Sequence, residues 1–138
     1  TVSIDPATGL LFIGDFSGFV HCLDAETGQL HWTHDMKAHM WGSTMVADGK
    51  VYVGDEDGDL VVLAANKGVP IPKAEQKPNG PTVRAQVISE VNLLSPVYST
   101  PVIANGVIYV ATQNHLFAFH DSAKAKPLGD QPKVELKK

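Results

Sequence analysis

The sequence predicts an all-β fold built from repeated antiparallel units, and three observations support this prediction. A glycine followed by a short apolar run occurs three times in the 138 residues. Each run is followed by a tight turn and a second apolar run. Each is also preceded by a short segment that carries small hydroxyl residues, shortened in the first repeat. Short apolar runs separated by Gly-rich and Asp-rich turns are typical of all-β proteins made of hairpins. The three runs are residues 9–15, 49–55 and 106–112.

These central runs are nearly continuous in apolar residues, so we expect each strand to be covered on both faces by neighbouring sheets. The turns after them, at residues 15–18, 55–58 and 112–114, contain Asp, Asn or Gly. Such residues tolerate the positive φ of tight hairpins. The sequence therefore predicts three central hairpins. Their second strands are expected at residues 20–23, 60–63 and 116–119.

The repeat spacing identifies the architecture. Gly14 and Gly54 are 40 residues apart, and a first strand is expected upstream of each run, at residues 43–46 and 99–103, with residues 2–4 as a shortened version. A period of about 40 residues with four short strands is typical of a β-propeller blade. The fold class expected is therefore about three four-stranded antiparallel blades of a β-propeller, incomplete as a ring.

The second repeat is longer than the first by about 17 residues, which fall at residues 66–82. This segment contains four prolines and two glycines, which disfavour a strand and predict a loop. The strand pattern resumes at residues 83–94 as the fourth strand of that blade. The expected organisation is a blade at 1–40, a blade at 41–94 with the insertion at 66–82, a partial blade at 95–121 and a basic tail at 122–138.

Three repeats are too few to close a ring, because a propeller needs about four to eight blades. Either the chain is a fragment whose remaining blades lie on other polypeptide, or several copies assemble around one axis. The last repeat offers no outer strand after residue 121. Two sources are considered for that strand: the N-terminal part of a longer parent chain, or residues Lys133 to Leu136 folding back.

The stretch after the first central hairpin carries a recognisable motif, Asp-x-x-Thr-Gly-x-x-x-Trp, formed by Asp24, Thr27, Gly28 and Trp32. Asp24 and Thr27 are expected to hydrogen-bond the turn backbone, and Gly28 to take the left-handed conformation. The Trp32 indole is expected to fill the gap between adjacent blades.

This motif resembles the tryptophan-docking repeat of pyrroloquinoline-quinone-type, or quinoprotein-like, propellers. The resemblance covers roughly residues 1–121, and it departs in the second repeat, where Gly68 is retained but no tryptophan follows. The chain looks like the C-terminal part of a longer bacterial repeat protein of this type. Exported proteins carry such repeats, so the resemblance implies a periplasmic or otherwise exported location.

The resemblance implies two functions. The first is a non-catalytic interaction or scaffold propeller, similar in repeat type to the outer-membrane assembly lipoprotein family. The alternative is a partial chain of a PQQ-dependent oxidoreductase, a class that holds quinone and calcium at the propeller centre. The single cysteine, Cys22, cannot form the adjacent-cysteine disulfide of those enzymes. We therefore expect no cofactor in this chain, and PQQ with calcium only in combination with the remaining blades.

Charge and composition limit the partners. Residues 1–121 carry six Lys or Arg against thirteen Asp or Glu, an acidic balance that repels nucleic acid. No apolar run reaches the roughly 20 residues of a membrane-spanning helix. The expected partners are the remaining blades of the same propeller or other copies of the chain, and other proteins.

The acidic turn at residues 55–59 has two interpretations. A calcium loop of the EF-hand type requires glycine sixth and glutamate twelfth, whereas here glycine is fourth and Asn66 is twelfth. A solvated hairpin turn is the preferred interpretation, with a weak cation site as the alternative. We expect no metal site among the six histidines, although His21 and His31 could meet across the turn between their strands.

No catalytic residue is expected. Cys22 is interpreted as a small buried apolar residue, because nothing nearby in the sequence stabilises a thiolate. Ser99 and Thr100 have no glycine elbow and are interpreted as packing and strand-end residues. Trp41, whose counterpart is Tyr98, is expected to be an inter-blade packing aromatic or, alternatively, to stack on a ligand near the ring axis.

Overall fold

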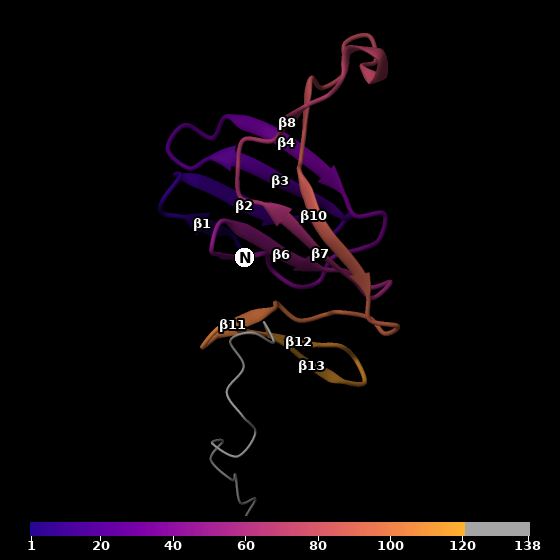
Figure 1. The fold of residues 1–138 in the computed structure, drawn as a ribbon. Helices are drawn as coiled ribbons and strands as arrows, with labels where there is room; N and C mark the ends of the chain where they lie inside the picture. Colours follow the sequence, from indigo (N-terminus) through magenta and orange to yellow (C-terminus); the bar gives the residue numbers. More distant parts are fainter. Residues whose placement is uncertain (121–138) are drawn as a thin grey trace, which may run out of the picture.

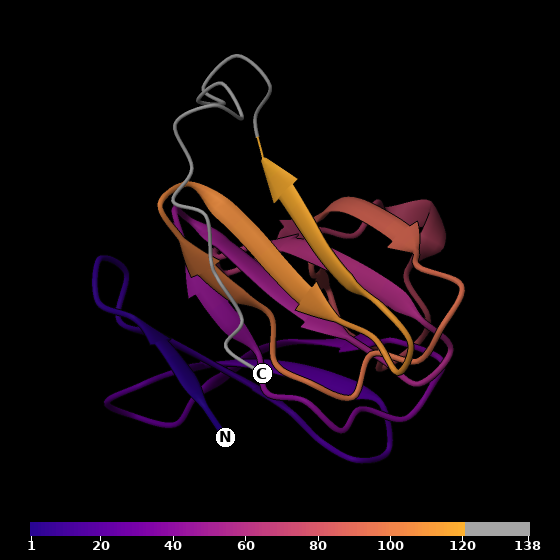
Figure 2. The same cartoon turned by 90° about the horizontal axis from the view of Figure 1, so that it is seen from below.

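A computed structural model gives the fold and describes residues 1–120. Most of its strands form three antiparallel sheets that follow one another along the chain, each being one propeller blade (Figure 1). The sheet of blade 2 lies between those of blades 1 and 3, and the three do not close a ring (Figures 1 and 2). The predicted fold class, an incomplete all-β propeller, is confirmed. No helix of the described part is long and apolar enough to cross a membrane.

Blade 1 is a four-stranded meander in chain order. Its strands are β1 (Ser3–Asp5), β2 (Leu10–Gly14), β3 (Phe19–Asp24) and β4 (Leu30–Asp35). A bulge between Cys22 and Leu23 shifts the register of β3 against β4. Alternate residues, among them Phe12, Cys22 and Trp32, face blade 2 and are buried.

Blade 2 is also four-stranded, in the spatial order β5-β6-β7-β10. Its strands are β5 (Met45–Ala47), β6 (Lys50–Gly54), β7 (Asp59–Ala64) and β10 (Val87–Asn92). The last four residues of β6 are all buried, as expected for a strand covered on both faces. The inner strand β5 begins at Met45, two residues later than expected, because the Ser43 backbone N–H donates to Thr100 Oγ1 instead of to a ladder partner.

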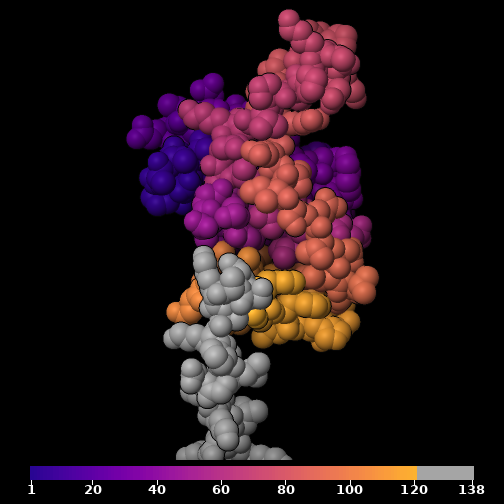
Figure 3. Space-filling model, in the orientation of Figure 1, coloured from indigo at the N-terminus to yellow at the C-terminus, as the bar shows by residue number. Residues whose placement is uncertain are grey.

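The insertion between β7 and β10 contains more structure than the sequence predicts. Its base is a two-stranded ladder of β8 (Val69–Pro70) and β9 (Val83–Arg84), and its tip carries the short 3₁₀ helix η1 (Lys73–Glu75). The expectation of an unpaired loop over 66–82 was therefore wrong at its base. Pro70 is tolerated because this ladder is only two residues long and has open edges. The tip projects away from the sheets (Figures 1 and 3).

Blade 3 has three strands in the described residues, β11 (Val102–Ala104), β12 (Val107–Ala111) and β13 (Leu116–His120). Among residues 1–120, no strand pairs with the outer edge of β13. The alternative in which Lys133 to Leu136 complete the blade lies outside the described residues. In β12 only Val110 is buried, so the expectation of cover on both faces was wrong for this blade in the described chain.

The hydrophobic core is divided between the two blade interfaces. A large cluster between blades 1 and 2 contains Phe12, Trp32, Val53 and Leu63. A smaller cluster between blades 2 and 3 is formed around Leu60, Leu93, Val97 and Val110. The fold is thus held by face-to-face packing of successive sheets, the arrangement that the near-continuous apolar runs indicate for a strand between two neighbours.

Candidate functional site

The turn between β3 and β4 contains the motif of Asp24, Thr27 and Gly28. Asp24 Oδ1 accepts hydrogen bonds from the Thr27 backbone N–H (2.8 Å), from Thr27 Oγ1 (2.8 Å) and from the Glu26 N–H (3.1 Å). The pKa of Asp24 is lowered, chiefly by the bond from the Thr27 N–H. Gly28 has φ of 72° and donates its N–H to the Asp24 carbonyl. These bonds fix the turn from which β4 starts.

Trp32 lies between blades 1 and 2 and is only 2% exposed. Its Nε1–H donates to the carbonyl of Asn66, two residues after the end of β7 (2.8 Å), and its ring is 5.9 Å from that of Phe12. Gly68 gives the indole room, because a Cβ there would lie 2.7 Å from Trp32 Cδ1. Trp32 is thus hydrogen-bonded and packed across the interface, and Asn66 is a partner that sequence reasoning did not identify.

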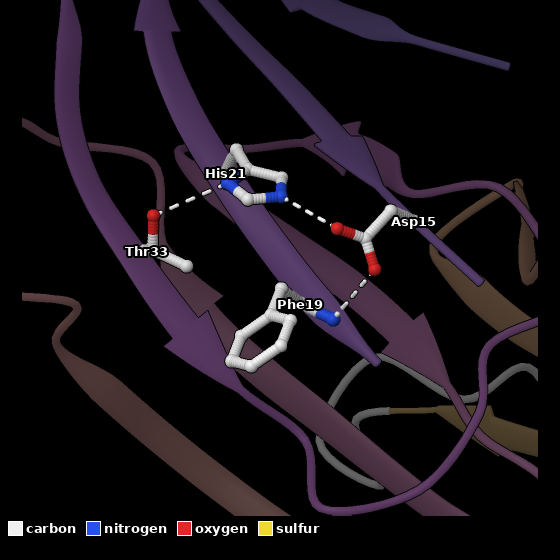
Figure 4. Close-up of polar contacts among 4 residues, drawn as sticks. All are labelled: Asp15, Phe19, His21 and Thr33. Carbon is white, nitrogen blue, oxygen red and sulfur yellow. Dashed lines mark hydrogen bonds and ion pairs between the residues drawn. The ribbon is translucent and has the colours of Figure 1, made fainter. Parts of the chain in front are cut away.

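A hydrogen-bonded row in blade 1 joins a carboxylate, an imidazole and a hydroxyl (Figure 4). His21 Nε2 lies 2.9 Å from Asp15 Oδ2, and His21 Nδ1 lies 3.1 Å from Thr33 Oγ1. Asp15 Oδ1 also accepts the Phe19 N–H (3.2 Å). The bond from His21 is the largest cause of the lowered pKa of Asp15. His21 does not meet His31, the possibility left open by the sequence, because the register places Thr33 opposite His21.

This row superficially matches a nucleophile, base and acid, which sequence reasoning missed. The spacing of the two residues could have indicated this contact, because Asp15 directly follows β2 and His21 lies near the start of β3 in the same hairpin. The row lies on the face of blade 1 opposite to the one that packs on blade 2, because His21 and Thr33 alternate with Cys22 and Trp32, which pack there. Thr33 is on a regular strand, without the strained elbow of a hydrolase nucleophile. The geometry therefore indicates a structural contact.

The equivalent turn in blade 2 has a different environment. Asp55 Oδ1 accepts the N–H groups of Asp57 (3.1 Å) and Asp59 (2.9 Å), but its side chain is fully buried and Oδ2 has no hydrogen-bond partner in the part of the chain that the structure describes. Burial raises the pKa of Asp55. The Ser95 hydroxyl in the next connection is also buried without a partner. The solvated-turn interpretation was therefore wrong for Asp55, because the connection to blade 3 covers it through the bond from Val97 N–H to the Asp55 carbonyl.

Trp41 is placed in the connection between blades 1 and 2 and is 58% exposed. Its ring meets Phe16 edge-on at 5.0 Å and Tyr98 edge-on at 6.0 Å, and its Nε1–H donates to Glu56 Oε2 (3.2 Å). Phe16 also stacks on His39 at 4.6 Å. We call Phe16, His39, Trp41 and Tyr98 the aromatic row. Trp41 thus contacts neighbouring elements of the propeller and presents more than half of its surface to solvent.

The remaining candidate residues have structural roles. Cys22 is buried, and burial raises the pKa of its thiol to about 12, which confirms its interpretation as a small core residue. Ser99 Oγ donates to the Ala111 carbonyl (3.0 Å) and Thr100 Oγ1 accepts from Ser43, so both make the expected strand-end hydrogen bonds. In the described residues, no three His, Cys, Asp or Glu side chains gather as a metal-binding group.

Two depressions are present on the surface. A groove of about 490 Å³ lies between β4 and the start of blade 2's outer strand, with Thr33, His34 and Asp35 on one side and Arg84 and Val87 on the other. Burial of the His34 side chain lowers the pKa of His34. A hollow of about 150 Å³ lies beside the aromatic row. The residues that line it are Ser17, Lys37, Ala38, His39, Glu56 and Asp57.

Taken with the fold, these contacts define a β-propeller built from pyrroloquinoline-quinone-type repeats. The chain belongs to the PQQ_2 family, described as outer membrane protein assembly factor BamB, whose model matches residues 6–92. The outer membrane protein assembly factor BamB of Moranella endobia (strain PCIT) is 28% identical over 123 residues, which cover 86% of this chain and 30% of that protein. The chain therefore spans less than a third of the length of this curated relative.

Solved structures agree on the fold. The computationally designed Ika4 protein superposes with a TM-score of 0.62 at 11% identity, over 86% of this chain and 63% of Ika4. The quinohemoprotein alcohol dehydrogenase ADHIIG from Pseudomonas putida HK5 has a TM-score of 0.56 at 24% identity, over 76% of this chain and 15% of the enzyme. At these identities the likeness shows the fold alone.

Proposed function

We propose that this chain is part of a non-catalytic interaction or scaffold propeller that acts in outer-membrane protein assembly. The match of the BamB family model to residues 6–92 carries the proposal. The structure supports it in two ways. His21, Ser99 and Thr100, which have side chains of catalytic types, are engaged in hydrogen bonds within or between blades. The exposed aromatic row offers a surface of the kind that protein interfaces use, since such interfaces are enriched in Trp, Tyr and Phe.

The alternative, a partial chain of a PQQ-dependent oxidoreductase, is tested by whether these residues fit the cofactor pair. A calcium-bound quinone requires several oxygen ligands in one place. Asp55 is the one carboxylate that is fully buried in the described chain, and its turn supplies no second buried acid. The described residues do not fit PQQ and calcium. We therefore propose that this chain holds no cofactor and that any such site would require the remaining blades.

The partners that we propose are further blades and other proteins. The outer edge of β13 and the exposed side chains of Val102, Tyr109 and Leu116 on blade 3 are surfaces that an adjoining blade would cover. That blade would belong to the same propeller or to another copy. An exported, periplasmic location accompanies the proposed role, because the relative named above is an outer membrane protein assembly factor.

The test is to remove the intact protein from its source cell and to measure the abundance of outer-membrane β-barrel proteins. The assembly role predicts a decrease that the restored protein reverses. Quinone absorbance and calcium-dependent dye reduction are measured on the same purified protein. Unchanged abundance together with dye reduction would overturn the scaffold proposal in favour of the oxidoreductase.

A further inference from the structure

We propose that the aromatic row and the adjacent hollow form a docking site for a partner-protein segment that carries an arginine or lysine next to an apolar residue. This inference rests on the proposed function, because it names the kind of partner that the scaffold binds. The site lies at one end of the blades, where β2 turns into β3 and where the outer strand of one blade leads to the inner strand of the next. Ring closure covers the faces of blades and leaves this end exposed.

The aromatic row is fixed in place before any partner arrives. Trp41 is held by Phe16, by Tyr98 and by its hydrogen bond to Glu56. His39 Nδ1 donates to the Phe16 carbonyl at 2.9 Å. Despite these contacts, Phe16 and Tyr98 are 56% and 47% exposed. A rigid, exposed aromatic surface loses little conformational entropy on binding, which favours its use as an interface.

The charge of the hollow selects a cation. Glu56 and Asp57 line it, and neither takes part in an ion pair within the described residues. The lysine that lines it, Lys37, is already paired with Asp35. Among residues 1–120, the Glu56 carboxylate has only the neutral Trp41 indole as a donor. A guanidinium or ammonium group placed here would meet two carboxylates next to the aromatic row.

The apolar half of the partner is indicated by the exposed rings of Phe16, Trp41 and Tyr98. A further exposed apolar side chain, Leu94 (92%), lies in the connection that leads to Tyr98. Leu94 has φ of 58° and occupies the position that Lys37, with φ of 70°, occupies in blade 1. In both, the backbone N–H donates to the side-chain oxygen two residues earlier. In blade 1 this bend presents Lys37, which is paired with Asp35, and in blade 2 it presents an exposed leucine. The two carboxylates of the hollow and the exposed rings of Phe16, Trp41 and Tyr98 therefore fit a segment with a basic residue next to an apolar one.

The experiment is an NMR titration of the intact, ¹⁵N-labelled protein with acetyl-Ala-Leu-Arg-Leu-Ala-amide, followed at the Trp41 indole N–H. Trp32 is the internal control, because its buried indole N–H should not shift. We expect saturable binding that weakens about tenfold in Glu56→Gln, which keeps the acceptor for Trp41 and removes the charge. Phe16→Ala should weaken binding to a similar extent. The matched control is Glu26→Gln, at the opposite end of blade 1.

A Trp41 signal that does not move, an unchanged affinity in Glu56→Gln, or equal binding of the peptide with Glu in place of Arg would each overturn the docking site. Calorimetry of Trp41→Ala with the same peptide checks the result without relying on the indole signal. The outcome is separable from the proposed function. Loss of peptide binding in these variants supports the docking site even where removing the protein leaves outer-membrane proteins unchanged.

Discussion

Blades 1 and 2 share one backbone plan but differ in the side chains that stabilise it. Trp32 stands opposite Cys22 in blade 1, whereas the residue opposite the equivalent Val62 in blade 2 is Ser89. Trp32 is buried in the interface that follows its blade, and Ser89 is exposed. The interface between blades 1 and 2 accordingly contains the larger core cluster, and that between blades 2 and 3 the smaller.

The turn between β2 and β3 and the turn between β6 and β7 differ in the same way. Asp15 and Asp55 accept equivalent backbone N–H groups, but Asp15 also pairs with His21, where blade 2 has Val61. The pKa of Asp15 is lowered chiefly by His21, and the pKa of Asp55 is raised by burial. The repeat thus specifies where a carboxylate sits, and its neighbours decide whether the fold favours the charged or the neutral form.

The largest loss of stability is expected from removing Trp32, the residue that most distinguishes blade 1 from blade 2. Trp32→Ala should lower the free energy of unfolding by about 3–5 kcal/mol, because it leaves a cavity and removes the donor to Asn66. Chemical denaturation of the intact protein measures this. The matched control Ser89→Ala should change stability by less than about 0.5 kcal/mol. A similar loss in both variants would show that the two interfaces are equivalent.

The second effect concerns Asp55. Asp55→Ala leaves the Asp57 and Asp59 N–H groups without their acceptor and should cost about 2–3 kcal/mol, against about 1 kcal/mol for Asp15→Ala at the more exposed turn. Unfolding by urea at neutral pH compares the two. Equal losses would show that burial does not distinguish the turns.

The pH dependence of the same two carboxylates should have opposite signs. Because the folded pKa of Asp55 is raised, its contribution favours the fold below the ordinary carboxyl pKa, and stability is lost as pH rises through the folded value. Asp15, with a lowered pKa, contributes stability above the ordinary value and loses it as pH falls. Asp55→Asn should therefore become more stable relative to the native protein as pH rises from about 4. Urea midpoints across that range test the sign, and a constant difference would contradict it.

Much of this fold could be predicted from the sequence, because glycine-bounded apolar runs and hairpin turns are local signals. The central hairpins of β2 with β3 and of β6 with β7 follow from residues near in sequence. The starts of the inner strands could not be predicted, because the Ser43 N–H bonds to Thr100, which is 57 residues away. The paired base of the insertion could not be predicted from its prolines, because Pro70 is tolerated only at an open strand edge and that edge is not visible in the sequence.

In the candidate sites, too, local contacts could be predicted from the sequence and long-range contacts could not. The turn bonds of Asp24 are local and could be anticipated from the motif. The burial of Asp55 depends on Val97, which comes from the connection to the next blade. The contact of His21 with Thr33 depends on a register set by the bulge at Cys22 and Leu23. A bulge changes which residues face one another, and nothing in the local composition reports it.

An intermediate loss of stability is expected from a substitution in front of the inner strand β5, at Thr44. Thr44 is buried, donates to the Phe12 carbonyl (3.0 Å) and bonds Ser3 Oγ (2.6 Å), so it joins blades 1 and 2. Pro101 holds the equivalent position before blade 3 and can make neither bond. Thr44→Val should cost about 1–2 kcal/mol, because it keeps the shape and leaves the carbonyl unpaired. The control Thr27→Val changes a hydroxyl in the exposed turn and should cost less in the same denaturation assay.

The smallest effect is expected from making the blade 1 turn resemble that of blade 2. His21→Val removes the partner of Asp15, but the pair is partly exposed, with 30% and 44% of the two side chains accessible. The loss should be below about 1 kcal/mol. The sharper measurement is NMR titration of the Asp15 carboxyl, whose pKa should move back towards the ordinary value. A rise above the ordinary value would mean that desolvation outweighs the remaining backbone hydrogen bonds at this turn too. The raised pKa of Asp55 would then be a property of the repeat itself and not a consequence of the connection that covers Asp55.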